Sequence, residues 1–349
     1  MISPERLPAR ETESEPQILF GCHFPKTEIS NAEIESWRVI TNAGNLLTAE
    51  AIYEKTGVER RYVATSYETV LTMGIAAAKP LIEKYGKDFA VIIFSTSYPT
   101  GKHLATQTAY SLRLNTFNVF DIYYACSGFV SALNYLEDYK DWFAQRRVLV
   151  ITSEKYSPTL PNLAEGEQDS SFSQTIFSDG AIASSFVYGK DLKVLALKNY
   201  QFNLDESQAL KMPIDYDLIK PPAKFIWIPP SCNGKFTMDG KKVYAAVVRK
   251  MPGLITEAVF SAGLRLDDVD LVIPHQASRH MLDGIAKRLS PVLSEKMVYD
   301  LEDGNFSSAS IPKAWMKAAA EGRIKPGAKI VLAAVGAGLF ASVAVVEVH

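Results

Sequence analysis

Short β-branched apolar runs recur along the chain and alternate with segments of helical periodicity. Six of these runs are typical of strands, at residues 89–96, 117–124, 147–153, 270–275, 297–301 and 329–335. Most are continuously apolar, which favours strands that are covered on both faces. Apolar residues at helical spacing follow two of them, between Phe129 and Phe143 and between Met281 and Leu289. This alternation predicts an α/β fold.

The order of these parts repeats. The run 117–124 turns through Ala-Cys-Ser-Gly into a helical segment, and the run 297–301 turns through residues 302–311 into another. Apolar strands joined by a glycine-containing turn follow in each copy. The repeat predicts two duplicated α/β halves, residues 18–190 and 191–349, arranged in layers.

Three segments should lie outside these halves or on their surface. Residues 1–17 are polar, lack the apolar run of a secretory signal and predict a flexible arm. Residues 156–175 are rich in Pro, Gly, Ser and acidic side chains, which indicates a surface excursion. The Pro-rich connection from Asp205 to about Pro230 contains an apolar stretch, so we expect it to pack on the body.

Composition excludes several classes of protein. Lys and Arg total 37 against 39 Asp and Glu, so no overall field favours nucleic acid or an anionic membrane. Three cysteines lie far apart without CxxC or Cys/His spacing, which argues against a disulfide framework and against a zinc site. We therefore expect a cytoplasmic protein that holds no metal, redox cofactor or lipid anchor.

The uncharged stretch from Ile330 to Val346 has two interpretations. It resembles a membrane anchor in composition, but it is shorter than the roughly 20 residues of a spanning helix. Gly336 and Gly338 divide it into two Val/Ala-rich halves. We predict strand, glycine turn and strand, with a tail anchor as the alternative.

Three polar residues stand at the ends of predicted strands. Cys126 begins a helical segment, where unpaired N–H groups and the helix dipole favour a thiolate, and Ser127 and Gly128 leave room for a substrate. His275 ends the run 270–275, and Asn305 lies in the turn before Pro312. Taken singly, each residue type more often has a structural role.

Together these motifs resemble a known family. ACSGF (125–129), HQAS (275–278) and GNFSSASIP (304–312) are similar, in order and surroundings, to the Cys, His and Asn motifs of the β-ketoacyl-[acyl carrier protein] synthase III family. TGVERRYVA (56–64), FSDGA (177–181) and VGAGLF (335–340) are similar to its flanking segments. The resemblance extends from about Ile18 to the C-terminus. It implies a thiolase fold with layers α-β-α-β-α and a homodimer whose sheet continues across the interface.

The resemblance also implies a chemistry. Cys126 would take an acyl group from a thioester, and His275 and Asn305 would hydrogen-bond the enolate formed when a malonyl-type thioester loses carbon dioxide. The enolate would attack acyl-Cys126 in a decarboxylative Claisen condensation. The backbone amides of Cys126 and of Ala337 or Gly338 would hold the oxyanions. A β-ketoacyl thioester is a further possible extender.

Several positions depart from the family pattern. Ala51 falls where relatives that use acyl-CoA carry a tryptophan that stacks on adenine. Lys55, Arg60 and Arg61 remain as candidate phosphate contacts, and Arg279 and His280 partly keep the basic CoA-binding stretch. The pattern favours an acyl carrier protein over CoA as the acyl donor.

Other departures concern the pocket. Phe306 replaces the usual Thr beside Asn305 and should reshape the pocket, and Ser278 replaces an Asn, weakening a water-holding position. Both changes favour specialised fatty-acid or polyketide metabolism. The loop 97–106 lacks the Glu that some relatives use for non-decarboxylative condensation; its Lys102 or His103 could approach the partner subunit's acyl pocket.

Two other classes stay open at this point. An acyltransferase of the same fold would use Cys126 and His275 to acylate oxygen or nitrogen, and a non-catalytic partner subunit would use none of the three residues.

Overall fold

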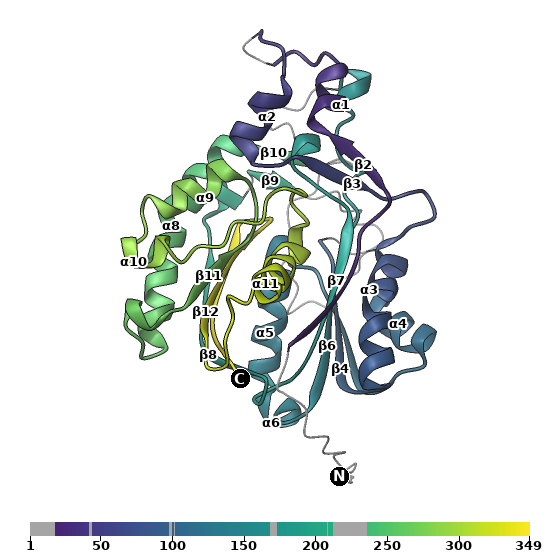
Figure 1. Ribbon diagram of the computed structural model, residues 1–349, viewed down its shortest axis with the longest axis vertical. Helices are drawn as coiled ribbons and strands as arrows, with labels where there is room; N and C mark the ends of the chain where they lie inside the picture. The colour runs from purple at the N-terminus through teal and green to yellow at the C-terminus, as the bar shows by residue number, and fades with distance from the viewer. Residues whose placement is uncertain are drawn as a thin grey trace.

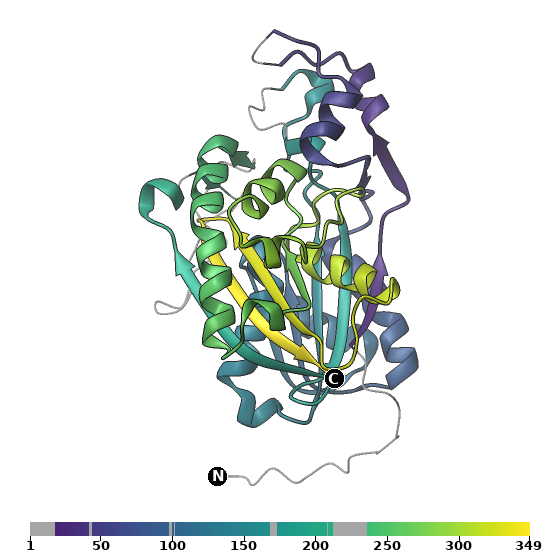
Figure 2. The same ribbon diagram turned by 60° about the vertical axis from the view of Figure 1, so that its left-hand side comes forward.

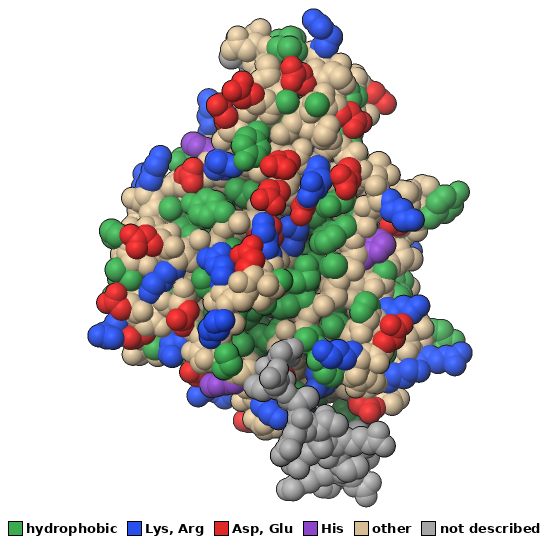
Figure 3. All heavy atoms as spheres, viewed as in Figure 1, with side chains coloured by type: hydrophobic (Ala, Val, Ile, Leu, Met, Phe, Trp, Pro, Cys, Tyr) green, Lys and Arg blue, Asp and Glu red, His purple; other side chains and the backbone are tan. Residues whose placement is uncertain are grey.

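The computed structural model describes residues 18–41, 44–97, 100, 102–167, 173–207, 209–211 and 236–349. The predicted arm at 1–17 and most of the connection expected between Asp205 and Pro230 lie outside the described residues. Two twisted sheets stand side by side with helices between and around them (Figures 1 and 2). Acidic and basic side chains lie interspersed on the face shown in Figure 3.

The first sheet has five strands in the order β1-β7-β6-β4-β5. Strand β4 is parallel to its neighbours β5 and β6, whereas β7 is antiparallel to β6 and β1. These strands are β1 (Leu19–His23), β4 (Asp88–Ser95), β5 (Asn115–Ile122), β6 (Arg147–Glu154) and β7 (Gly180–Val187).

The second sheet repeats this plan in the order β11-β12-β13-β8. Strand β11 is parallel to β12, and β13 is antiparallel to β12 and β8. Its strands are β8 (Leu192–Gln201), β11 (Leu271–Pro274), β12 (Lys329–Gly336) and β13 (Phe340–Val348). The prediction of two duplicated halves is confirmed. In the sequence, residues 190–191 lie between β7 of the first sheet and β8 of the second.

Five layers follow from the way the strands alternate. In β4, Val91 and Ile93 face the central layer of α5 (Gly128–Asp138) and α11 (Ser310–Ala320), while Ile92 and Phe94 face α3 (Val70–Tyr85) and α4 (Leu104–Leu112). Helices α8 (Gly240–Ser261) and α9 (Arg279–Ala286) cover the outer face of the second sheet. The predicted α-β-α-β-α architecture is confirmed.

Smaller elements surround these layers. They are α1 (Asn31–Ser36), α2 (Ala49–Thr56), α6 (Lys140–Phe143), α7 (Leu204–Ser207), α10 (Pro291–Ser294) and the strand pairs β2 (Thr27–Ser30) with β3 (Arg60–Val63) and β9 (Leu210–Lys211) with β10 (Thr237–Met238). In Figure 1, α1, α2, β2 and β3 form a cap above the first sheet.

The two halves also share an uncommon backbone turn. Ala125 and Ser307 both have a positive φ, 45° and 49°. Each begins a short 3₁₀ turn, Ala125–Ser127 or Ser307–Ala309, that leads directly into α5 or α11. L-residues rarely adopt this region, so the same strained turn at the same place supports the duplication.

Two strand predictions need correction. Residues 297–301 form one bridge, Met297 with Val272, and no strand. The Asp300 N–H donates to the side chain of Gln276 at 2.8 Å instead of to a neighbouring strand, which ends the pairing. Strand β5 is an edge strand with exposed Phe117 and Phe120, so it is not covered on both faces as expected.

The apolar stretch near the C-terminus is strand, turn and strand as predicted. It forms the antiparallel pair β12 and β13, and Gly338 has a φ of 77° in the turn between them. In the part of the chain that the structure describes, no helix has the length and apolar character needed to cross a bilayer.

Candidate active site

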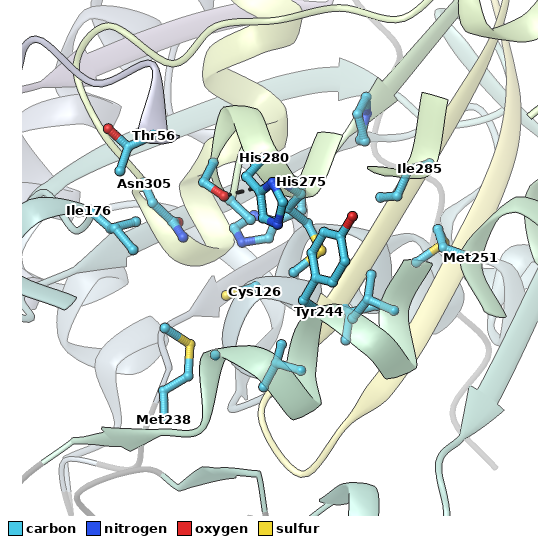
Figure 4. Close-up of a pocket in the computed structure, with 18 of the residues that line it drawn as sticks. Thr56, Cys126, Ile176, Met238, Tyr244, Met251, His275, His280, Ile285 and Asn305 are labelled. Carbon is cyan, nitrogen blue, oxygen red and sulfur yellow. Dashed lines mark hydrogen bonds between the residues drawn. The ribbon is translucent and has the colours of Figure 1, made fainter. Parts of the chain in front are cut away.

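A cavity of about 660 Å³ brings together the three residues singled out in the sequence. Cys126 reaches it from the turn before α5, His275 from the end of β11, and Asn305 from the turn before α11 (Figure 4). Each side chain therefore comes from the end of a strand or from a turn beside a central helix, where functional groups can meet without interrupting a sheet.

The turn at Cys126 is packed tightly against the first sheet. A Cβ atom at Gly128 would lie 1.9 Å from the Ser95 hydroxyl, so only glycine fits at the first position of α5. Glycine is therefore required here for packing against Ser95, and not to leave room for a substrate as the sequence suggested. Cys126 itself is 7% exposed and lines the cavity.

The surroundings of Cys126 oppose ionisation of its thiol. Burial raises its pKa to about 12, and the charge of Glu154 acts in the same direction. A hydrogen bond with the Ser307 hydroxyl, at 3.3 Å, lowers the pKa only in part. Burial therefore opposes the thiolate expected from the helix-start position.

His275 is held by backbone contacts at the end of β11. Its backbone N–H donates to the Ala333 carbonyl at 2.7 Å. The side-chain amide of the adjacent Gln276 donates to the carbonyls of Pro274 and Val298 at 2.6 and 3.1 Å. Burial lowers the pKa of the imidazole to about 3. A neutral ring with so low a pKa suits hydrogen-bond donation from one nitrogen better than proton abstraction.

Asn305 presents its amide group to the cavity. The Oδ1 atom accepts hydrogen bonds from the Ser307 N–H at 2.7 Å and from the Ser310 hydroxyl at 3.3 Å. The backbone is fixed by a parallel bridge with Phe177. Because Oδ1 is occupied, the Nδ2 group is the side free to donate to a ligand; Figure 4 shows this side chain directed toward Cys126.

The turn between β12 and β13 lies against the Cys126 turn. A Cβ atom at Gly336 would lie 2.4 Å from the Tyr124 carbonyl and 3.3 Å from the Ser127 nitrogen. Ala337 and Gly338 follow directly, between the cavity-lining residues Val335 and Leu339. This close approach can bring a second backbone amide near the sulfur, although the oxyanion role of either residue stays a prediction.

Three further predicted residues line the cavity, namely Lys55, Ser278 and His280. The Ser278 hydroxyl accepts the Met281 N–H at 3.3 Å and so caps α9. The His280 ring stacks on Tyr244 at 4.3 Å between centroids. Their substrate contacts remain predictions.

Four predicted residues have other surroundings. Arg60 pairs with Asp303 at 2.8 Å, and Arg61 is buried and donates to Asn31 and to the Thr175 carbonyl. Burial lowers the pKa of Arg61 to about 9. This arginine packs inside the protein, so it is not the surface phosphate contact expected.

Arg279 and Phe306 also lie outside the cavity wall. The Arg279 guanidinium covers the ring of Tyr53 at 4.9 Å. The Phe306 ring is fully buried and packs on Phe24 and Tyr62 at 5.3 and 6.2 Å. The expectation that Phe306 reshapes the pocket directly is not met, because its ring points into this separate aromatic cluster.

One wall of the cavity was missed by the sequence analysis. It is formed by Met238 and by one face of α8, with Val243, Tyr244, Val247 and Met251. The four-residue spacing of Val243, Val247 and Met251 is a helical signal that could have identified it. This wall makes much of the cavity apolar.

Two duplicated halves with a cysteine, an imidazole and a carboxamide around one apolar cavity define a thiolase-fold enzyme site for thioester chemistry. The family models for 3-oxoacyl-[acyl-carrier-protein] synthase III match residues 120–198 and, for its C-terminal part, residues 259–348. The chain belongs to the β-ketoacyl-[acyl-carrier-protein] synthase III family. It is a condensing enzyme of the ketosynthase type, and hence a transferase, which excludes the non-catalytic class and favours carbon–carbon bond formation over acyl transfer to oxygen or nitrogen.

Individual relatives support this assignment. The chain is 32% identical to β-ketoacyl-[acyl-carrier-protein] synthase III of Agrobacterium fabrum and 33% identical to that of Rhizobium meliloti, each over 91% of this chain and 94% of the relative. The synthase III structure from Aquifex aeolicus superposes with a TM-score of 0.77 at 27% identity, covering 95% of this chain and all of that one. The priming β-ketosynthase of the R1128 polyketide pathway has a TM-score of 0.75 at 26% identity, with 98% and 99% covered.

Proposed function

We propose that this enzyme accepts an acyl group on Cys126 and extends it by decarboxylative condensation with a malonyl thioester carried on an acyl carrier protein. The observation that carries the proposal is the convergence of Cys126, His275 and Asn305 on one cavity. A neutral imidazole and a free Nδ2 group provide two donors for a thioester enolate. The proposal places the enzyme in the cytoplasm, where an unpaired thiol stays reduced.

Residues of α2 and of the cavity wall support one choice of acyl donor. Ala51 is exposed on α2 and has no ring on which adenine could stack. Tyr53, an aromatic residue on the same helix, has one face covered by Arg279. Lys55 and Lys241 line the cavity and suit the phosphate of a phosphopantetheine arm, which CoA and carrier proteins share. These features favour an acyl carrier protein over free CoA.

A comparison of donors tests this proposal. Matched acyl-CoA and acyl-carrier thioesters are each supplied with carboxyl-labelled malonyl-carrier, and labelled carbon dioxide release is measured. We expect release with both donors but a kcat/KM about tenfold higher for the carrier thioester, since base stacking on an aromatic ring is worth roughly 1–3 kcal/mol. Equal values or a preference for CoA would refute the choice of donor, and absence of carbon dioxide release would refute the condensation.

A gain-of-function variant sharpens the comparison. Ala51→Trp should lower KM for acyl-CoA and leave the carrier reaction unchanged. Glu50→Trp, also exposed on α2, is the matched control for adding an indole to this helix.

The proposal includes a homodimer joined along β5. This strand is an edge of the first sheet, and the rings of Phe117 and Phe120 are exposed by 67% and 39%. An unpaired edge with exposed aromatic residues is suited to pairing with a second copy. Sedimentation velocity should give the mass of two chains at micromolar concentration, and Phe117→Glu should shift the distribution toward one chain; a monomeric wild-type protein would contradict the dimer.

A further inference from the structure

A chain of hydroxyl groups leads from the protein interior to the Cys126 sulfur. The Ser307 hydroxyl lies 3.3 Å from Sγ and 2.8 Å from the hydroxyl of Ser97. The phenol of Tyr156 donates to Ser97 at 2.7 Å and contacts Ser307 at 3.2 Å. All three residues are buried, and none belongs to the cavity wall.

The contacts allow one direction of donation that ends on the sulfur. If the Tyr156 phenol donates to Ser97 and the Ser97 hydroxyl donates to Ser307, the proton of Ser307 is left for Sγ. Each donation polarises the next group, and a hydrogen bond delivered to sulfur stabilises the thiolate more than the thiol.

Glu154, at the end of β6, is hydrogen-bonded both to the segment that contains Ser97 and to the turn that contains Ser307 and Ser308. Its Oε2 accepts from the Ser97 N–H at 3.0 Å, and its Oε1 accepts from the Ser308 N–H at 3.2 Å and from the Ser308 hydroxyl at 2.5 Å. The side chain is fully buried. One carboxylate thus ties the loop after β4 to the turn before α11, which fixes the distance between Ser97 and Ser307.

We propose that Ser307 and Tyr156 are positioning residues for acylation, because through Ser97 they direct a hydrogen bond to the Cys126 sulfur as it becomes a thiolate. This role rests on the proposed nucleophile. Tyr156 lies in the segment expected as a surface excursion, yet it is 1% exposed and stacks on the cavity residue Phe177 at 4.5 Å. The packed ring gives the phenol a fixed direction.

Alkylation of Cys126 by iodoacetamide tests the proposal without depending on enzyme activity. In the wild type we expect the rate to rise with pH and reach no plateau by pH 10, because the thiol pKa is raised to about 12. The titratable groups that interact with the Cys126 thiol are Glu154 and Tyr156, and His275 lines the same cavity. Burial raises the pKa of Glu154 to about 7, so its ionisation opposes thiolate formation and should flatten the rise between pH 6 and 8.

Two variants each remove one hydroxyl group from the series Tyr156, Ser97 and Ser307. Ser307→Ala should slow alkylation at pH 8 by about 10- to 100-fold, since a hydrogen bond to a charged group contributes roughly 1.5–3 kcal/mol. Tyr156→Phe should slow it by about two- to threefold, because its hydroxyl acts by polarising the others. Alkylation of the exposed Cys22, measured in the same sample after proteolysis, is the internal reference for the rate at Cys126.

Matched controls remove equivalent groups elsewhere. Ser153→Ala deletes a buried hydroxyl that donates to the Val70 carbonyl, and Tyr188→Phe deletes a buried phenol that donates to Glu137. Neither should change alkylation of Cys126.

A second measurement separates this role from a merely structural one. Enzyme acylated in advance should release carbon dioxide from malonyl-carrier within about twofold of the wild-type rate in Ser307→Ala, because carbon dioxide leaves as the enolate forms, before the Cys126 thiolate is expelled. The acylation step should be slowed about as much as alkylation. Unchanged alkylation in Ser307→Ala would overturn the proposal. Equal losses in alkylation and in carbon dioxide release would also overturn it, because they indicate a distorted site. Failure of acylation in the wild type, with the alkylation differences intact, would instead refute the proposed function.

Discussion

Replacement of Cys126 by alanine is expected to abolish the acyl-enzyme. The Cys126 sulfur lines the cavity and is the proposed nucleophile, so no covalent intermediate should form without it. Loss of a nucleophile in a coupled site costs at least about 10⁴-fold in turnover. Intact-protein mass spectrometry after exposure to an acyl thioester should show the added acyl mass in the wild type and none in Cys126→Ala.

The matched control is Cys22→Ala. Cys22 is a free, exposed cysteine on β1, and its removal should leave both the added mass and the turnover unchanged. An acyl adduct on Cys126→Ala, or loss of the adduct in Cys22→Ala, would contradict the assignment of the nucleophile.

Changes at Asn305 should separate the two half-reactions. Asn305→Ala removes the Nδ2 donor, so we expect acylation within a few-fold of the wild type and condensation slower by about 10²–10³-fold. Carbon dioxide release by the acylated enzyme measures this loss, since the donor is needed when the enolate forms.

The alanine variant also removes the Oδ1 acceptor of the Ser307 N–H and the Ser310 hydroxyl. Asn305→Asp keeps both contacts and replaces the donor by a carboxylate oxygen, so it should lose condensation at least as strongly while the melting temperature stays close to that of the wild type. Normal carbon dioxide release by Asn305→Asp would remove Asn305 from the proposed enolate site.

The cavity proposed to hold the acyl and extender groups has one strongly apolar wall. Met251 of α8 belongs to this wall and lies on the far side of Tyr244 from Cys126 in Figure 4. A cavity of about 660 Å³ lies within the size range of pockets that enclose small organic ligands.

Local patterns were sufficient for much of the fold and for three site residues. The apolar runs at 89–96, 147–153 and 329–335 have a strand signature because both faces of β4, β6 and β12 are covered. Cys126, His275 and Asn305 could be found because each stands where a predicted strand ends or a helix begins, and because their flanking motifs resemble one family.

The tertiary structure alone decided the surroundings of those residues. The pKa of Cys126 is raised by burial among groups from distant segments. The position of Cys126 at a helix start therefore could not predict the direction of this pKa shift. The ring of Phe306 and the guanidinium of Arg61 turn into the interior, although both stand beside motif residues. The contacts from Tyr156 to Ser97 and Ser307 join residues 59 and 151 positions apart. Spacing along a chain indicates which residues share one helix or strand, but a contact between loops depends on how the sheets and helices pack.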